Sequence, residues 1–363
     1  MVFCTLFDSN YLDKGLTLYS SLEKVLNDFR LYILAMDEKC FEVLNDLNYS
    51  HIVPIEINKF SQSEGLNELR KERSQTEFCW TCTAYLIDYV LTSYKEEICT
   101  YIDADMYFYS NPQCLLDEMG GKSVQIIEHR FTNSIKDRIS QKESGRFCVE
   151  FNTFRNDESA RELLQWWKSK CYESCSAKSE DQNVFGDQKY LESWANHPNV
   201  SVVSNLGAGV APWNVAQYKL SSGSNDKLPI VLKHKKENKK MELIFYHYHN
   251  ITYTNKHEVN INVYQRAWGI DDNLIKELYI PYLKEIDQIK GLLSETYGIK
   301  TLIQIHPSFV GRMKKKQKDV HDIYKYIINK SIKDMYILLY LNINSKLRRL
   351  FKEKKNIISL KER

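Results

Sequence analysis

The sequence is poor in the features that mark fibrous, disordered or membrane-spanning chains. Only 13 glycines and 7 prolines occur among its 363 residues, whereas 43% of the residues are apolar. These proportions argue against collagen-like, low-complexity and disordered classes and favour a globular chain, with length for roughly two domains. The most apolar stretch, Met335–Leu341, is far too short to span a bilayer. The N-terminus has neither the basic nor the long apolar segment of a secretory signal, so we expect a cytoplasmic protein.

The cysteines form no even, regularly spaced set that would indicate a disulfide framework. There are nine of them, scattered along the chain, and we expect free thiols in a reducing compartment. Cys79 and Cys82 have the spacing of a redox motif but do not follow a clear strand. Cys171 and Cys175 lie four residues apart, and no histidine or cysteine set with zinc-finger spacing accompanies them. Buried structural thiols are therefore the favoured interpretation of both pairs.

A large excess of one charge is also absent, because 50 Lys and Arg residues against 47 Asp and Glu residues give a net charge of +3. The charge is nevertheless unevenly placed. Residues 311–363 carry sixteen basic and five acidic residues, a net charge of +11, which leaves −8 on residues 1–310. A mildly acidic body with a strongly basic end indicates a partner or a surface that the basic end contacts.

The basic end also has a helical pattern. Apolar residues recur there at steps of three and four, among lysines and arginines: Ile332, Tyr336, Leu339, Ile343, Leu347 and Leu350. Such a basic amphipathic helix is typical of segments that lie in an anionic membrane interface. The alternative is a helix that packs on the body and turns its basic face to solvent. No RNA-binding motif accompanies the charge, so we expect no nucleic-acid partner.

Apolar runs of strand length alternate with helical patterns before residue 255, which predicts an α/β sheet covered by helices on both faces. We expect Asp13 and Asp157 to cap helices, with further helices near Lys39–Leu47 and Thr83–Leu91. The predicted strands are Val2–Phe7, Leu31–Met36, His51–Ile57, Ile98–Ile102, Val124–Ile127, Cys148–Phe154, Val200–Val203, Ile230–Leu232 and Leu243–Tyr248.

Polar side chains follow several of these strands at the point where each ends. In open α/β sheets, ligands bind at the carboxyl ends of the strands, so these side chains are the candidate site residues. They are Asp8, Asp103 with Asp105, Glu128 with His129 and Arg130, Asn152, and His247 with His249.

Asp103 and Asp105 leave their strand two residues apart and therefore point the same way. Paired carboxylates suit Mg²⁺ or Mn²⁺, and a divalent cation stabilises the charge that builds up on a departing diphosphate. His247 and His249 also share one strand face, and one of them, with His247 slightly favoured, is a candidate further metal ligand.

Five segments, in order, resemble a glycosyltransferase of the GT-A fold that uses a nucleotide-activated sugar, and one of them, Gly186–Gln188, resembles the motif of the galactosyl- and glucosyltransferase-like families. The segments are Phe7–Tyr11, Asp103–Asp105, Phe151–Phe154, Gly186–Gln188 and Phe245–His249. A second set of segments, Thr81–Pro112, His129–Phe131, Phe185–Trp194 and Gly207–Asn214, resembles bacterial glycosyltransferases of surface polysaccharide pathways. The resemblance covers about residues 1–255. It implies a Rossmann-like nucleotide-diphospho-sugar transferase domain there, with a mixed sheet flanked by helices. Beyond this domain we expect a helical extension over 256–310 and basic amphipathic helices over 311–363.

The resemblance also implies roles for individual residues. Asp8 and Tyr11 would hold the nucleotide, Asp103 and Asp105 the metal and diphosphate, and a late histidine would complete the metal site. Asn152 would lie near the donor sugar. Asp187 and Gln188 match the acidic-Gln motif, and Asp187 would act at the reacting centre.

Other roles stay open at this point. Asp187 or Glu128 would be the base if the enzyme inverts, and a carboxylate would only position the sugar if it retains. A helix cap is the alternative reading of Asp187. The loop Gly207–Asn214 has small residues that allow close backbone approach, and a sugar could stack on its Trp213.

Two departures from the family pattern concern the donor. Lys189 follows Gln188 where a second Asp is common, and Thr81–Thr83 stand where an Arg is often found on the helix before the Asp-X-Asp strand. Arg73 is our candidate substitute for that arginine.

The sequence thus predicts a Mn²⁺- or Mg²⁺-dependent transfer of a sugar from a nucleotide donor, with UDP favoured, to a hydroxyl of a glycan or lipid-linked acceptor. The basic end would place the enzyme on the inner face of the cytoplasmic membrane. The alternatives are a nucleotidyltransferase or other phosphate-handling enzyme, and a non-catalytic membrane-attached scaffold. The segment Phe7–Leu16 lacks the Gly-rich phosphate loop of a nucleotidyltransferase.

Overall fold

The computed structural model describes residues 1–132, 135–176, 181, 183–222, 229–255, 258–263, 269–300 and 357–359. The chain divides into two compact units, one of Met1–His249 with Gly269–Lys300 and one of Asn250–Trp268 with Thr301–Arg363. In the second unit, β14 (Glu258–Asn260) pairs antiparallel with β13 (Thr252–Asn255) and with β15 (Ile357–Ser359). The amphipathic helix expected between residues 332 and 350 lies outside the described residues.

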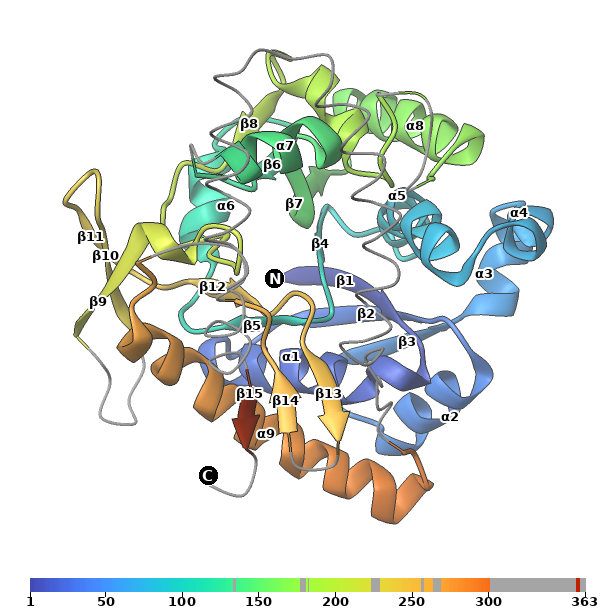
Figure 1. Ribbon diagram of the computed structural model, residues 1–363. Helices are drawn as coiled ribbons and strands as arrows, with labels where there is room; N and C mark the ends of the chain where they lie inside the picture. Colours follow the sequence, from blue (N-terminus) through green and yellow to red (C-terminus); the bar gives the residue numbers. More distant parts are fainter. Residues whose placement is uncertain are drawn as a thin grey trace, which may run out of the picture. The chain divides into compact units, whose positions relative to one another are not determined.

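A seven-stranded mixed sheet forms the centre of the first unit, with the order β3-β2-β1-β4-β7-β6-β8 (Figure 1). Its strands are β1 (Val2–Phe7), β2 (Arg30–Ala35), β3 (Ile52–Glu56), β4 (Ile98–Ile102), β6 (Val124–Glu128), β7 (Phe147–Arg155) and β8 (Val200–Val202). Only β7 runs antiparallel to its neighbours β4 and β6. The strands β1 and β2 are almost wholly buried apolar runs, as expected where both sheet faces are covered. The predicted α/β architecture is confirmed.

Helices cover both faces of this sheet. On one face lie α1 (Leu12–Val25) and α2 (Glu38–Leu47), and on the other α3 (Ile57–Ser63), α5 (Gln75–Ser93) and α8 (Glu158–Glu173). Further helices are α4 (Asn67–Glu72), α6 (Gln113–Met119) and α7 (Ile135–Ser144), and the 3₁₀ turns are η1 (Ser9–Tyr11), η2 (Lys189–Trp194) and η3 (Val215–Gln217).

The two predicted helix caps have different outcomes. Asp157 caps α8 by accepting the Ala160 N–H, as predicted. The prediction for Asp13 is wrong, because Asp13 lies inside the first turn of α1. The chain instead turns through η1, which Asp8 caps by accepting the Asn10 N–H.

Two smaller antiparallel sheets complete the first unit. The strands β9 (Tyr218–Ser222), β10 (Val231–His234) and β11 (Lys240–Glu242) form one of them. The other is a ribbon of β5 (Met106–Phe108) and β12 (Phe245–His247), in which His247 lies opposite Met106. Because β5 begins directly after Asp105, this register brings the late histidine segment to the aspartate pair.

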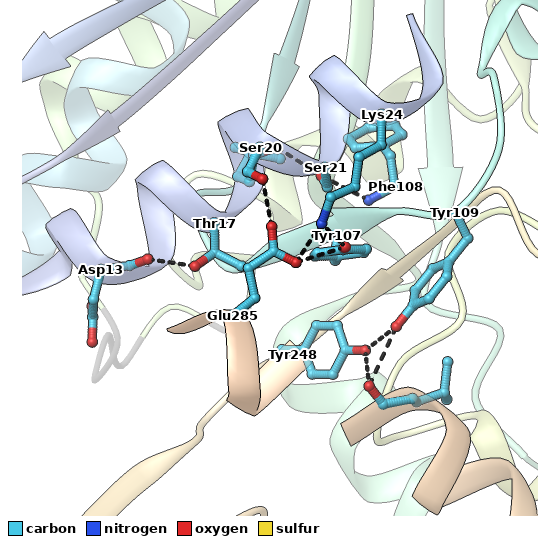
Figure 2. Close-up of polar contacts among 12 residues, drawn as sticks. Asp13, Thr17, Ser20, Ser21, Lys24, Tyr107, Phe108, Tyr109, Tyr248 and Glu285 are labelled. Carbon is cyan, nitrogen blue, oxygen red and sulfur yellow. Dashed lines mark hydrogen bonds and ion pairs between the residues drawn. The ribbon is translucent and has the colours of Figure 1, made fainter. Parts of the chain in front are cut away.

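A long helix, α9 (Asp272–Tyr297), packs on α1 and on the ribbon within the first unit. Figure 2 shows the Glu285 carboxylate of α9 at the centre of the contact. It accepts hydrogen bonds from Ser20, from Lys24 Nζ at 2.6 Å and from the Tyr107 hydroxyl at 2.8 Å. The Tyr248 hydroxyl donates to the Leu278 carbonyl at 2.8 Å. These contacts fasten α9 against the ribbon from the side opposite to its site residues. None of the described helices is both long and apolar enough to cross a bilayer.

Candidate active site

A cavity of about 370 Å³ opens at the carboxyl ends of β1 and β4. Eight of the predicted site residues line it: Asp8, Tyr11, Asp103, Asp105, Asp187, Gln188, His247 and His249. A larger hollow of about 600 Å³ between α1 and α9 contains none of them. The chemistry-bearing side chains therefore converge on the smaller cavity, at the sheet edge where an α/β fold places its ligands.

The centre of the cavity is a cluster of carboxylates and imidazoles. His247 Nε2 lies 3.0 Å from Asp105 Oδ1 and 3.8 Å from Asp103 Oδ2. Asp105, His247 and His249 each offer a ligand atom within 4.8 Å of the others. Adjacent ligands of one cation at metal–ligand distances of about 2.1 Å stand about 3 Å apart, so this spacing fits a divalent cation.

Burial makes the charges of this cluster interdependent. Burial raises the pKa of Asp103 to about 7, although the neighbouring His247 opposes the rise. Burial also acts on Asp105, but the two histidines hold the pKa of that carboxyl below its usual range. For His247, burial disfavours the charged form, yet Asp105 raises its pKa well above the ordinary value. Negative charge thus exceeds what His247 alone compensates, which favours a bound cation.

Asp187 lies at the end of a tight turn on another wall of the cavity. Gly186 has φ +57°, and a Cβ there would stand 3.2 Å from the Trp80 ring. The Trp167 indole N–H donates to the Asp187 carbonyl at 2.9 Å, which fixes the backbone. The Asp187 side chain is buried, and burial raises its pKa to about 7 against a hydrogen bond from Thr83. It caps no helix, since η2 begins after Gln188 and has no side-chain cap.

Asp8 and Tyr11 form the wall next to the first strand. The Asp8 carboxylate accepts the Asn10 N–H at 3.0 Å. Tyr11 is 40% exposed, and the buried Lys14 ammonium stands 3.5 Å from its ring centre, a cation–π contact that fixes the ring.

The first two turns of α5 supply a wall that the sequence patterns did not indicate. Gln75, Thr76, Cys79, Trp80 and Thr83 line the cavity. They recur at steps of three and four along the helix, so a helical-face plot of this segment would have grouped them.

Glu128, Arg73 and Asn152 do not line this cavity, and each has other surroundings than its predicted role implies. Glu128 forms an ion pair with Arg146 and is partly exposed. Arg73 donates to the carbonyls of Cys171 and Tyr172 and so ties the end of α4 to the end of α8. The side chain of Asn152 is buried within the sheet, where its amide has no hydrogen-bond partner among the described residues.

The loop of residues 207–214 supports the histidine strand instead of offering a stacking surface. Trp213 is only 5% exposed, and its ring meets those of His247 and His249 edge-on. The backbone N–H of His247 donates to the Val210 carbonyl at 2.9 Å. Arg130 donates to the backbone carbonyls of Ala208 and Val203 and so holds this loop, and neither Arg130 nor His129 lines the cavity.

The cysteines form no disulfide in this structure. All nine are free thiols, and Cys82, Cys171 and Cys175 are buried. Cys79 and Cys148 border the cavity. Burial raises the pKa of Cys79 to about 12, so its thiol is a poor nucleophile.

A mixed sheet of this order, with an Asp-X-Asp segment leading into a ribbon that a late histidine strand completes, defines the GT-A fold. The chain is similar to the crystal structure of the galactosyltransferase LgtC in complex with donor and acceptor sugar analogs. That similarity has a TM-score of 0.50 at 15% sequence identity and covers 79% of this chain and 96% of LgtC. The protein therefore has the fold that its sequence motifs implied.

Sequence relatives place the chain more closely. No known protein-family profile matches it. It is 31% identical over 226 residues to the uncharacterized protein YfnF of Bacillus subtilis (strain 168), and the matched segment covers 60% of this chain and 74% of YfnF. It is 28% identical over 296 residues to the uncharacterized protein YfnD of the same organism, and here the matched segment covers 80% of this chain and 91% of YfnD. The chain belongs to the family of YfnF.

Proposed function

We propose that this protein is a metal-dependent glycosyltransferase that moves a sugar from a nucleotide-diphosphate donor to a hydroxyl of a glycan or glycolipid. The observation that carries the proposal is the convergence of Asp103, Asp105 and His247 beside Asp187 in one cavity of a GT-A fold. The role in surface polysaccharide synthesis and the preference for a UDP-sugar rest on the sequence motifs.

Asp103, Asp105 and His247 would hold Mn²⁺ or Mg²⁺, with His249 beside them. When bound, the cation supplies neutralisation of the negative charge that develops on the departing diphosphate. Asp8 and the exposed ring of Tyr11 would bind the nucleoside, since Tyr11 offers a flat face that Lys14 supports from behind.

Asp187 would act at the sugar. In an inverting reaction it accepts the proton of the acceptor hydroxyl, and a base with a pKa of about 7 suits that task at neutral pH. In a retaining reaction it accepts a hydrogen bond from a sugar hydroxyl and orients the ring. Gln188 cannot swing freely in either case, because its side-chain amide donates to the Ser144 carbonyl at 2.6 Å.

Binding of UDP by the full-length protein, measured calorimetrically with and without Mn²⁺, tests the proposal. We expect Mn²⁺-dependent binding, and we expect Asp105→Asn to abolish it together with sugar transfer from UDP-glucose or UDP-galactose. The matched control is Asp117→Asn on the exposed side of α6, which should behave as wild type.

The rival functions predict other results. Metal-dependent binding of nucleotide with release of pyrophosphate from a nucleoside triphosphate would support a nucleotidyltransferase. Absence of any metal-dependent binding of UDP or GDP would reject an enzyme of this class and leave the scaffold interpretation.

The charge of the chain supports a cytoplasmic protein attached to the inner face of the membrane, where lipid-linked acceptors are found. The net charge of +11 over residues 311–363 would attract anionic lipid at about 1 kcal/mol for each basic residue near the surface. Replacement of Lys346, Arg348, Arg349 and Lys352 by Gln should weaken sedimentation with phosphatidylglycerol vesicles and leave phosphatidylcholine vesicles unaffected. Equal binding of the variant and wild type to the anionic vesicles would refute the attachment.

A further inference from the structure

Glu150, a residue that the sequence patterns did not single out, lies at an irregularity in β7. Between the pairs Gln125–Thr153 and Ile127–Cys148, one residue of β6 stands opposite four residues of β7. On its other edge β7 keeps regular pairing with β4, and the Asp103 N–H continues that ladder by donating to the Glu150 carbonyl at 3.3 Å. Such bulges redirect side chains beside functional sites. The regular ladder with β4 sets Glu150 directly across from Asp103, the first aspartate of the pair.

The Glu150 carboxylate is fully buried and has a single polar partner among the described residues. Its Oε2 lies 2.6 Å from His247 Nδ1, while Oε1 has no hydrogen-bond partner there. A buried carboxylate is costly unless it is paired, and this hydrogen bond offsets part of that cost. The Nδ1 atom of His247 is thereby engaged in a hydrogen bond with Glu150.

The backbone of the loop of residues 207–214 lies close to the Glu150 carboxylate at Gly209. Gly209 has φ +66°, and a Cβ there would stand 3.1 Å from Glu150 Oε1 and 2.8 Å from Ile127 Cδ1. Only glycine fits this approach without displacement of its neighbours. The loop that closes on Glu150 is the same one whose Val210 carbonyl holds the His247 backbone.

Cys148, Glu150 and His247 also have ligand atoms close enough to suggest a second metal site. The distance between His247 Nδ1 and Glu150 Oε2 favours a hydrogen bond between them instead. Two ligands of a tetrahedral zinc at about 2.0 Å stand about 3.3 Å apart, whereas these atoms are 2.6 Å apart, a hydrogen-bond distance. Glu150 is therefore a partner of the histidine and not a metal ligand.

From this geometry we infer that Glu150 is a positioning residue, which holds the proton of His247 on Nδ1 and so presents the Nε2 lone pair to the cation beside Asp105. The inference rests on the proposed function. A carboxylate that accepts from the second nitrogen of a ligating histidine fixes the tautomer and ring orientation, and its loss commonly costs 10- to 100-fold in metal affinity.

The test is Glu150→Gln in the full-length protein, with Mn²⁺ affinity measured by calorimetry in the absence of nucleotide. We expect a 10- to 100-fold weaker affinity. The matched control is Asp88→Asn, which also removes a buried carboxylate, one that pairs with Lys168 away from the cavity. The control should lose stability and keep the Mn²⁺ affinity of wild type. Equal Mn²⁺ affinity in folded Glu150→Gln and wild type would overturn the inference.

A spectroscopic measurement decides the matter even if Glu150→Gln does not fold. In wild-type protein with ¹⁵N-labelled histidine and Mg²⁺, the His247 signals, assigned with His247→Gln, should show the tautomer protonated on Nδ1. The Nε2-protonated tautomer would overturn the inference. A wild-type protein that binds no Mn²⁺ even with UDP would instead contradict the proposed function, so the two failures are distinguishable.

Discussion

Replacement of Asp187 by Asn should stabilise the protein at pH 8 and have little effect at pH 4. Burial raises the pKa of Asp187 from its ordinary 3.8 to about 7 in the folded chain. The folded chain therefore keeps this proton at pH values where the unfolded chain has lost it. As the pH rises from 4 to 7, the contribution of Asp187 to the free energy of unfolding falls, and above pH 7 the loss of that contribution is complete.

The size of the effect follows from the pKa difference between the two states. A difference of about 3 corresponds to about 4 kcal/mol at pH 8, of which roughly 2.5 kcal/mol accumulates between pH 5 and pH 8. Asn has nearly the same shape and no proton to lose, so Asp187→Asn should avoid this cost. In urea unfolding, its advantage over wild type should grow with pH by about that amount.

Thr83 provides the control, because its hydrogen bond lowers the pKa of Asp187. Thr83→Val should raise the pKa of Asp187 further in the wild-type background, so the loss of stability with pH should extend to higher pH. In the Asp187→Asn background it should have an effect that does not change with pH. A difference in unfolding free energy between Asp187→Asn and wild type that is equal at pH 5 and pH 8 would refute the reasoning.

Three further variants test other contacts by urea unfolding or ligand binding. Glu285→Ala should lower the free energy of unfolding by about 2–4 kcal/mol, since it removes the acceptor of three hydrogen bonds. Its control, Glu68→Ala in an exposed ion pair, should leave that free energy within about 0.5 kcal/mol of wild type. Gly209→Ala should cost about 1–3 kcal/mol and weaken Mn²⁺ binding, whereas Gly121→Ala, which has open space, should do neither. Arg73→Met should lower the melting temperature and leave UDP affinity unchanged; a tenfold loss of affinity would restore the sequence-based role of Arg73.

The sheet strands were predictable because each is a short apolar run with a polar residue at its end. The Ile98–Ile102 strand matches β4 residue for residue, and Val2–Phe7 matches β1. The strands β9 and β11 gave no such signal, since their exposed and half-buried residues include few apolar side chains. Asp13 was misassigned because the turn η1 shifts the cap to Asp8, and a 3₁₀ turn of three residues has no periodicity to detect.

Site residues were predictable where a strand end alone decides their position. Asp103 and Asp105 follow a strand and must lie at its carboxyl end, whatever the rest of the fold does. Glu128 also ends a strand, but β6 is separated from β4 by β7, so its side chain pairs with Arg146 instead of reaching the cavity. Strand order is set by long-range pairing that a local pattern does not contain.

Glu150 is the residue that no local pattern would have found. It lies inside a mostly apolar strand, Phe147–Arg155, where a single acidic residue suggests either a wrong strand assignment or a solvent-exposed position. Its position follows from three long-range facts: the bulge against β6, the ladder to Asp103, and the register that brings His247 opposite Met106. With Asp103 and Asp105 it puts three carboxylates around one imidazole in a buried site. Such an arrangement is costly for folding unless a cation compensates it, so Mn²⁺ should raise the melting temperature of wild type more than that of Asp105→Asn.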